Sequence, residues 1–179
     1  MPITNKLRGK AWIFGDLMGV DAEIYPLHIA NREFREMNRP IPDELLAKYC
    51  MTGIDPDFPK KVKKGDFIVA GRNFGYGHDH YDACGAIRGA GISAVLCESS
   101  TIIFQRNSIH NAVPVIVCEG ITKKTKEGDE LEVDLIAGTI ENVTTGDKWQ
   151  FAPFPNFLMD IIEAGGLHPY IMNRQGKWD

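Results

Sequence analysis

A glycine-rich loop, Gly71–Asp82, gathers the side chains of this sequence that are best suited to proton transfer. It contains His78, Asp79 and His80 in direct succession, and histidine side chains exchange protons near neutral pH. Gly77 stands immediately before them and permits backbone angles that other residues avoid, so the loop can approach a small molecule closely. The types and spacing of these residues predict acid–base chemistry beside a bound ligand.

Two other interpretations of this loop stay open on the residues alone. His78 and His80 could ligate a metal ion together with Asp82 or the distant His110, although two histidines are fewer ligands than a metal site needs. The loop could also be a tight connection in which Asp79 and Asp82 only cap the following helix and bind water.

The loop lies inside a run of alternating strands and helices. Short apolar runs rich in β-branched residues alternate with helical stretches, which predicts parallel strands joined by right-handed crossovers. The expected strands cover 67–70, 94–97 and 113–117, and the expected helices cover 81–89 and 101–110, the second capped by Ser99 or Ser100. Ligands of such sheets collect at the carboxyl ends of the strands, where a helix N-terminus attracts an anion. The loop is therefore well placed for a carboxylate ligand.

The remaining sequence predicts elements around this core. A strand is expected at 10–14, an irregular stretch follows, a helix opens at 40–44 and ends before Gly53, and 55–64 is expected to be a solvated connector. Turn signals at 127–129 and 145–147 flank hairpin strands at 131–135 and 139–143, and a last helix is expected over 155–164. These elements predict one α/β domain over residues 1–179, with a parallel βαβαβ core and added antiparallel hairpins.

Composition and charge exclude several functional classes. The 179 residues are 44% hydrophobic and 25% charged, as in folded globular proteins and unlike disordered chains. A net charge of -4 gives no electrostatic reason to bind nucleic acid. The sequence has no apolar run near the roughly 20 residues of a membrane span, and its first residues lack the apolar stretch of a secretion signal. We expect a cytoplasmic protein without nucleic-acid or membrane partners.

The cysteines predict no metal cluster in this chain alone. Cys50, Cys84, Cys97 and Cys118 are widely spaced and form no C-x-x-C pair. Free cysteine is among the most buried residue types, so we expect all four to be small buried hydrophobic groups.

Three long stretches resemble a known enzyme family. They read G-D-F-I-V-A-G-R-N-F-G-Y-G-H-D-H-Y-D-A at 65–83, G-I-S-A-V-L-C-E-S-S at 91–100 and I-F-Q-R-N-S-I-H-N-A-V-P at 103–114. They are similar to the small subunits of isopropylmalate isomerase and homoaconitase. The similarity extends to Gly15–Asp16 with Asp21 near the start and to Ala164–Leu167 near the end.

The resemblance implies a swivelling domain of the aconitase superfamily. In that superfamily a separate large subunit binds a [4Fe-4S] cluster, and the small subunit closes over a hydroxy di- or tricarboxylic acid. This chain would then be active as a hydro-lyase only with its large subunit, and the cluster would belong to that partner. The absence of clustered cysteines agrees with this division.

The loop departs from the family at the residues that do the chemistry. The family places G-S-S-R at the helix entry, with a serine as base and the arginine gripping a carboxylate. Here His78 and Asp79 replace the serines, His80 replaces the arginine, Tyr76 replaces a cysteine and Ile102 replaces a second arginine. The resemblance therefore implies His78 as base or proton shuttle, with Asp79 orienting it or serving as the base itself. His80 would bind a carboxylate as a single-point donor, together with the backbone N–H groups that follow Gly77.

The segment that sets substrate specificity in the family is also altered. A longer stretch, Pro26–Arg39, stands in its place and carries Arg32 and Arg35 on an expected turn. Either arginine is a candidate for gripping a substrate carboxylate.

Two other functional classes compete with the enzyme. Loss of the serine and both arginines favours a non-catalytic swivel-domain paralogue that acts as a ligand-binding or regulatory partner, whereas the two histidines of the loop argue against it. A stand-alone metal-binding protein that uses His78 and His80 is the third possibility.

Overall fold

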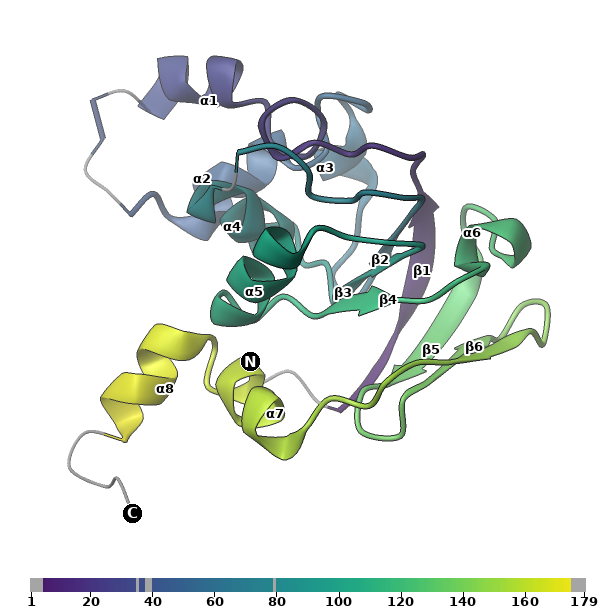
Figure 1. Ribbon diagram of the computed structural model, residues 1–179. Coiled ribbons are helices and arrows are strands. Elements are labelled where there is room, and N and C mark those ends of the chain that lie inside the picture. Colours follow the sequence, from purple (N-terminus) through teal and green to yellow (C-terminus); the bar gives the residue numbers. More distant parts are fainter. Residues whose placement is uncertain (1–4, 35, 38–39, 79, 175–179) are drawn as a thin grey trace.

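The protein is built on a mixed sheet (Figure 1). The computed structural model describes residues 5–34, 36–37, 40–78 and 80–174. In this part of the chain the sheet has seven strands in the order β4-β3-β2-β1-β5-β6-β7. The strands are β1 (Lys6–Ile13), β2 (Phe67–Ala70), β3 (Ala94–Cys97), β4 (Val115–Val117), β5 (Glu130–Asp134), β6 (Thr139–Asn142) and β7 (Lys148–Gln150).

Helices connect and cover these strands. The described helices are η1 (Val20–Ile24), α1 (Leu27–Phe34), α2 (Asp43–Leu46), η2 (Ala47–Tyr49), α3 (Phe58–Lys61), α4 (Tyr81–Gly89), α5 (Ile102–His110), α6 (Ile121–Lys124), α7 (Asn156–Glu163) and α8 (Leu167–Asn173). None of the helices in the described residues is long and apolar enough to cross a lipid bilayer.

Strand β1 joins two halves of the sheet with different pairing. Its carboxyl end pairs in parallel with β2, for example Ile13 with Val69. Its amino end pairs antiparallel with β5, for example Lys6 with Asp134. Strands β2, β3 and β4 continue in parallel, while β5, β6 and β7 continue antiparallel. The predicted parallel core and the added antiparallel hairpins are confirmed.

The parallel strands are buried on both faces. Every residue of β2 and β3 is buried, and alternate side chains of β2 enter two separate core clusters. Ile68 packs in the cluster that contains Phe58 and Phe104, whereas Phe67 packs in the cluster that contains Met159. Each such buried side chain stabilises the fold by about 1.5–3 kcal/mol, which explains the continuous apolar runs that identified these strands.

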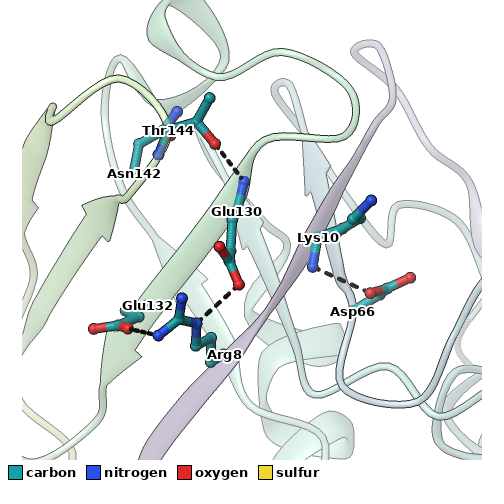
Figure 2. Close-up of polar contacts among 7 residues, drawn as sticks. All are labelled: Arg8, Lys10, Asp66, Glu130, Glu132, Asn142 and Thr144. Carbon is teal, nitrogen blue, oxygen red and sulfur yellow. Dashed lines mark hydrogen bonds and ion pairs between the residues drawn. The ribbon is translucent and has the colours of Figure 1, made fainter.

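Polar contacts hold the junction between the two halves (Figure 2). On the exposed face, Arg8 donates from Nε to Glu130 and from Nη1 to Glu132, each over 2.8 Å. Near the start of β2, the Asp66 carboxylate accepts from the Lys10 amide over 3.1 Å. The arginine pairs are open to solvent and contribute little to stability, whereas Asp66 is buried and fixes the register of the parallel pair.

The structure corrects several sequence-based expectations. The stretch after β1, expected to be irregular, forms η1 and α1, and the expected solvated connector contains α3 with a fully buried Phe58. The cap of α4 is the His80 backbone without a side-chain hydrogen bond, and Asp82 lies in the first turn rather than before it. Thr101, not Ser99 or Ser100, caps α5 by accepting from the Phe104 amide. Asp79, the other expected cap, lies outside the described residues.

Candidate functional site

Three loops meet at the carboxyl ends of neighbouring strands. We name them the β1 loop (14–19), the β2 loop (71–80) and the β3 loop (98–101). Figure 1 shows the purple segment that follows β1 and the teal segment that follows β2 lying side by side above the sheet. This is the edge at which parallel sheets bind ligands.

Main-chain hydrogen bonds join the β1 loop to the β2 loop. The Gly75 amide donates to the Met18 carbonyl over 2.8 Å, and the Val20 amide donates to the Tyr76 carbonyl over 2.9 Å. These bonds use backbone groups and do not depend on which side chains the loop carries. The β2 loop therefore keeps its path when its side chains change.

The β3 loop supports the β2 loop from the other side. The Phe74 amide donates to the Ser99 carbonyl over 3.0 Å, and the Thr101 hydroxyl donates to the Gly75 carbonyl over 2.7 Å. Gly75 has a φ of +74°, and a Cβ added there would lie 2.2 Å from the Phe104 ring. This position therefore requires glycine for both conformation and space.

The structure brings two predicted site residues together with one that the sequence did not assign. The rings of His78 and His80 have centroids 5.2 Å apart, and His80 Nε2 lies 2.9 Å from Oδ1 of Asp21. His78 is exposed, and Gly77 before it has a φ of +94° and open space around its α-carbon. The predicted role of Asp79 falls on a residue outside those described.

Asp21 is the site residue that sequence reasoning missed. The sequence marks Asp21 only through the family resemblance, because none of the residues next to it along the chain indicates that it is a partner of His80. The available signal was its position just beyond the carboxyl end of β1, since adjacent parallel strands bring their following segments together.

Of the two arginines expected at the site, the structure describes Arg32 and does not join it to the β2 loop. Arg32 is exposed on α1, and no hydrogen bond or ion pair between it and the described part of the β2 loop is present. Arg35 lies outside the described residues. Their proposed contact with substrate stays a prediction.

The segment that carries Arg32 is a docked helix, so the expectation of a turn is wrong. The Tyr49 hydroxyl donates to the Glu33 carboxylate, which raises the pKa of Tyr49 to about 12. The same bond lowers the pKa of Glu33 below its ordinary value. The Tyr49 ring packs edge-on against Phe34 with centroids 5.7 Å apart. These contacts with η2 hold α1 in place.

The described residues do not form a metal centre. No group of three or more histidine, cysteine or acidic side chains in them could hold a metal ion. His110 is at the far end of α5 from the β2 loop, about 13 Å along a nine-residue helix, so the alternative interpretation in which it joins His78 and His80 as a metal ligand is not supported. His110 lines instead a hollow of about 800 Å³ with Arg88 and His168, which Tyr81 and Asp82 of the first turn of α4 also line.

The cysteines are buried hydrophobic groups, as the sequence predicted. All four are buried, and they are divided between the two core clusters. Burial raises the pKa of the Cys97 thiol to about 12 and that of the Cys118 thiol to about 11. Such thiols are neutral and inaccessible, so they do not fit an iron–sulfur cluster.

The comparison with protein families decides which family these residues belong to. Residues 20–119, from η1 through the β2 and β3 loops to just beyond β4, match the Aconitase C-terminal domain. The chain belongs to this family. The expected resemblance to the aconitase superfamily is confirmed.

Relatives of this aconitase C-terminal domain cover nearly the whole chain. The chain is 44% identical over 171 residues to the isopropylmalate/citramalate isomerase small subunit of Methanocaldococcus jannaschii, and the matched region covers 96% of each chain. It is also 44% identical to the 3-isopropylmalate dehydratase small subunit of Halothermothrix orenii, covering 90% of this chain and 93% of the relative.

A solved structure agrees with the fold. The crystal structure of 3-isopropylmalate dehydratase from Methanocaldococcus jannaschii superimposes with a TM-score of 0.81 at 36% identity and covers 95% of each chain. This aconitase C-terminal domain thus shares its fold with that structure over nearly its whole length.

Proposed function

We propose that the chain is the small subunit of a two-subunit hydro-lyase that dehydrates or isomerises a hydroxy di- or tricarboxylic acid. The observation that carries the proposal is end-to-end similarity to proteins named as small subunits of isopropylmalate isomerase and dehydratase. The whole of 1–179 acts as one swivel domain in this proposal. A cytoplasmic location agrees with a soluble biosynthetic enzyme of this kind.

The large subunit supplies the cofactor in this proposal. A [4Fe-4S] cluster held there provides Lewis-acid chemistry at the leaving hydroxyl group. The buried thiols of the present chain do not fit such a cluster. The tasks left to this chain are to bind the substrate carboxylates and to move a proton.

His78 is the residue that we assign to proton transfer. Its side chain is exposed at the tip of the β2 loop, where it can reach a molecule held against this face. Asp79 follows it directly and either orients the imidazole or takes the proton itself. An imidazole is well suited to this work because its charge changes between about pH 5 and pH 8.

His80 and the backbone after Gly77 are assigned to carboxylate binding. His80 occupies the place of the family arginine and is half-buried at the entry to α4. Arg32 and Arg35 are candidates for the second carboxylate. This assignment is supported by their charge and by the position of their segment, which replaces the family's specificity element.

The non-catalytic alternative is not favoured, because the full-length relatives are named as enzyme subunits. The stand-alone metal-binding alternative lacks a ligand set in the described residues.

The proposal is tested by reconstitution. The chain is purified with and without the large subunit from the same organism, under anaerobic conditions, and each sample is offered isopropylmalate, citramalate and dimethylmalate. Formation or loss of the carbon–carbon double bond is followed by ultraviolet absorbance. We expect activity only in the complex. Stoichiometric [4Fe-4S] in the chain alone, or an inactive complex loaded with its cluster, would contradict the proposal.

A further inference from the structure

The contact between Asp21 and His80 is the most specific side-chain arrangement at the site. Oδ1 of Asp21 is buried, and no described residue, His80 included, makes a well-aligned hydrogen bond to it in the orientation that the structure gives. His80 Nε2, 2.9 Å away, is the charged partner that faces this oxygen. An unpaired buried carboxylate oxygen is costly, so the arrangement favours a proton on Nε2.

The backbone around Asp21 holds its carboxylate in place. Asp21 is the second residue of η1, a single turn closed by the Ile24 amide donating to the Gly19 carbonyl over 3.0 Å. Val20 and Ile24 on either side of it are buried. The Glu23 carboxylate of the same turn accepts a hydrogen bond from the Gly19 amide over 2.9 Å. Asp21 is thus the carboxylate of this turn that faces the β2 loop.

We propose that Asp21 is a positioning residue that holds His80 by Nε2, so that Nδ1 is the nitrogen offered to the substrate carboxylate. The inference rests on the proposed function and assigns a role within the same site. Which nitrogen of a histidine carries the proton is set by the partner of the other nitrogen. Asp21 therefore decides the state in which His80 can bind an anion.

The proton count follows from this contact. A protonated ring has two N–H groups, so it donates from Nε2 to Asp21 and from Nδ1 to the substrate. A neutral ring keeps its single proton on Nε2 beside Asp21, and Nδ1 then presents a lone pair that repels a carboxylate. Substrate binding through His80 is consequently lost when the ring loses its second proton. Without Asp21, a neutral ring can place its proton on Nδ1 and still donate.

The titratable groups on the elements next to His80 are Asp21 and Glu23 on η1, His78 on the β2 loop, and Tyr81 and Asp82 in the first turn of α4. Asp79 lies outside the described residues. Among the described groups, the charged contact that the structure gives to the His80 ring nitrogen is the one to Asp21. Its removal is therefore the sharpest test.

The test compares Asp21→Ala with wild type in the complex with the large subunit. We expect KM to rise about 10-fold near pH 6, the factor for one lost charged hydrogen bond, while kcat changes less than about 3-fold. The wild-type KM should rise from about pH 6 to pH 8, and this rise should be flatter in Asp21→Ala. Asp21→Glu should recover part of the pH dependence.

Two further variants separate positioning from simple structural support. The double variant Asp21→Ala/His80→Ala should match His80→Ala alone within about 2-fold, since Asp21 acts through His80. Asp16→Ala is the matched control, because it also removes a carboxylate whose contact is structural. The Asp16 carboxylate accepts a hydrogen bond from the backbone amide of Arg72 over 2.7 Å. We expect Asp16→Ala to lower the unfolding temperature and to leave the pH dependence of KM unchanged. Additive losses in the double variant, or an unchanged pH dependence in Asp21→Ala, would overturn the inference.

A spectroscopic measurement keeps the inference separate from the proposed function. Ring ¹⁵N signals of the full chain are recorded while malate, a hydroxy dicarboxylate, is added near pH 6 (about the midpoint for imidazole). We expect the ¹⁵N chemical shifts of the His80 ring to change on addition of malate in wild type and not in Asp21→Ala. The signals of His28, His110 and His168 serve as internal controls. An inactive wild-type complex contradicts the proposed function. Equal malate responses in both proteins, or none in wild type, contradict the role of Asp21.

Discussion

The parallel and antiparallel halves of the sheet are held together in different ways. In the parallel half, β2 and β3 are wholly buried, and the loops at their carboxyl ends are joined through main-chain hydrogen bonds. In the antiparallel half, β5 alternates between buried and exposed residues, and exposed ion pairs such as Lys148 with Glu141 lie across the strands. The first arrangement is specified by backbone geometry and the second by side chains.

This difference explains how the site can change while the fold persists. By the family resemblance, His78, Asp79 and His80 would stand where the family has serines and an arginine, yet the path of the β2 loop is held by backbone amides and carbonyls. Tyr76, His78 and His80 are therefore free to vary as long as the glycines that allow the path remain. Changes to the backbone of this half should do far more damage than changes to side chains in the other half.

The largest effect is expected for Gly75→Ala. The added Cβ would meet the Phe104 ring at 2.2 Å, and the residue would have to adopt a φ of +74°. We expect a loss of about 2–4 kcal/mol in unfolding free energy and little remaining activity. Urea unfolding measures the first and the complex assay the second. Gly77→Ala is the control, with open space around it, and should cost only about 1 kcal/mol. Equal losses would contradict a packed loop junction.

If His78 is the general base that we propose, His78→Ala should lower kcat by about 10²-fold to 10⁴-fold, and it should not reduce stability because the side chain is exposed. The plot of kcat against pH should lose the change near neutral pH that a catalytic histidine produces. Asp79→Asn should be milder if Asp79 only orients the imidazole. A His78→Ala complex within a few-fold of wild type at every pH would leave Asp79 or a large-subunit residue as the base.

Arg32→Ala and Arg35→Ala should each lower kcat/KM by about 10-fold to 100-fold if the residue grips a carboxylate. Arg32 is exposed, so its removal should leave the unfolding temperature unchanged. Steady-state kinetics of both single variants and the double variant give the measurement. Unchanged kinetics in all three would remove this segment from the site.

Tyr49→Phe tests a side-chain contact within the parallel half. The hydroxyl bond to Glu33 lowers the pKa of that carboxylate, so its stabilising contribution is present above the ordinary glutamate range and is lost as the pH falls. It also raises the pKa of Tyr49 to about 12, so the contribution disappears as the pH rises toward that value. We expect a small difference in unfolding temperature near neutral pH that closes below about pH 4. A difference that persists there would contradict the contact.

The smallest effect is expected for Arg8→Ala in the antiparallel half. Its two carboxylate partners are solvent-exposed, and such pairs contribute little. The unfolding temperature should stay within about 2 °C of wild type, and any difference should vanish in high salt. A loss as large as that of Gly75→Ala would show that side chains in this half matter as much as the backbone of the other.

The sequence predicted most of the parallel core and the hairpin strands β5 and β6, but not β7, because the signals of the former are local. Continuous apolar runs marked β2 and β3, glycine turns marked β5 and β6, and the strand-to-helix pattern marked α4 and α5. It did not predict α1, α3 or α8. The fully buried Phe58 of α3 packs against Trp12 and Phe14 of a distant segment, and no local pattern encodes such a contact.

By itself, the sequence determined the family, the site loop and its histidines, because these depend on residue types at fixed spacing. Only the tertiary structure decided which groups meet. Pairing of β1 with β2 brings η1 against the β2 loop and so places Asp21 beside His80. The same fold separates His110 from that loop by the length of α5. Contacts of this kind depend on how strands far apart in the chain align, and that alignment is fixed by burial of the whole core.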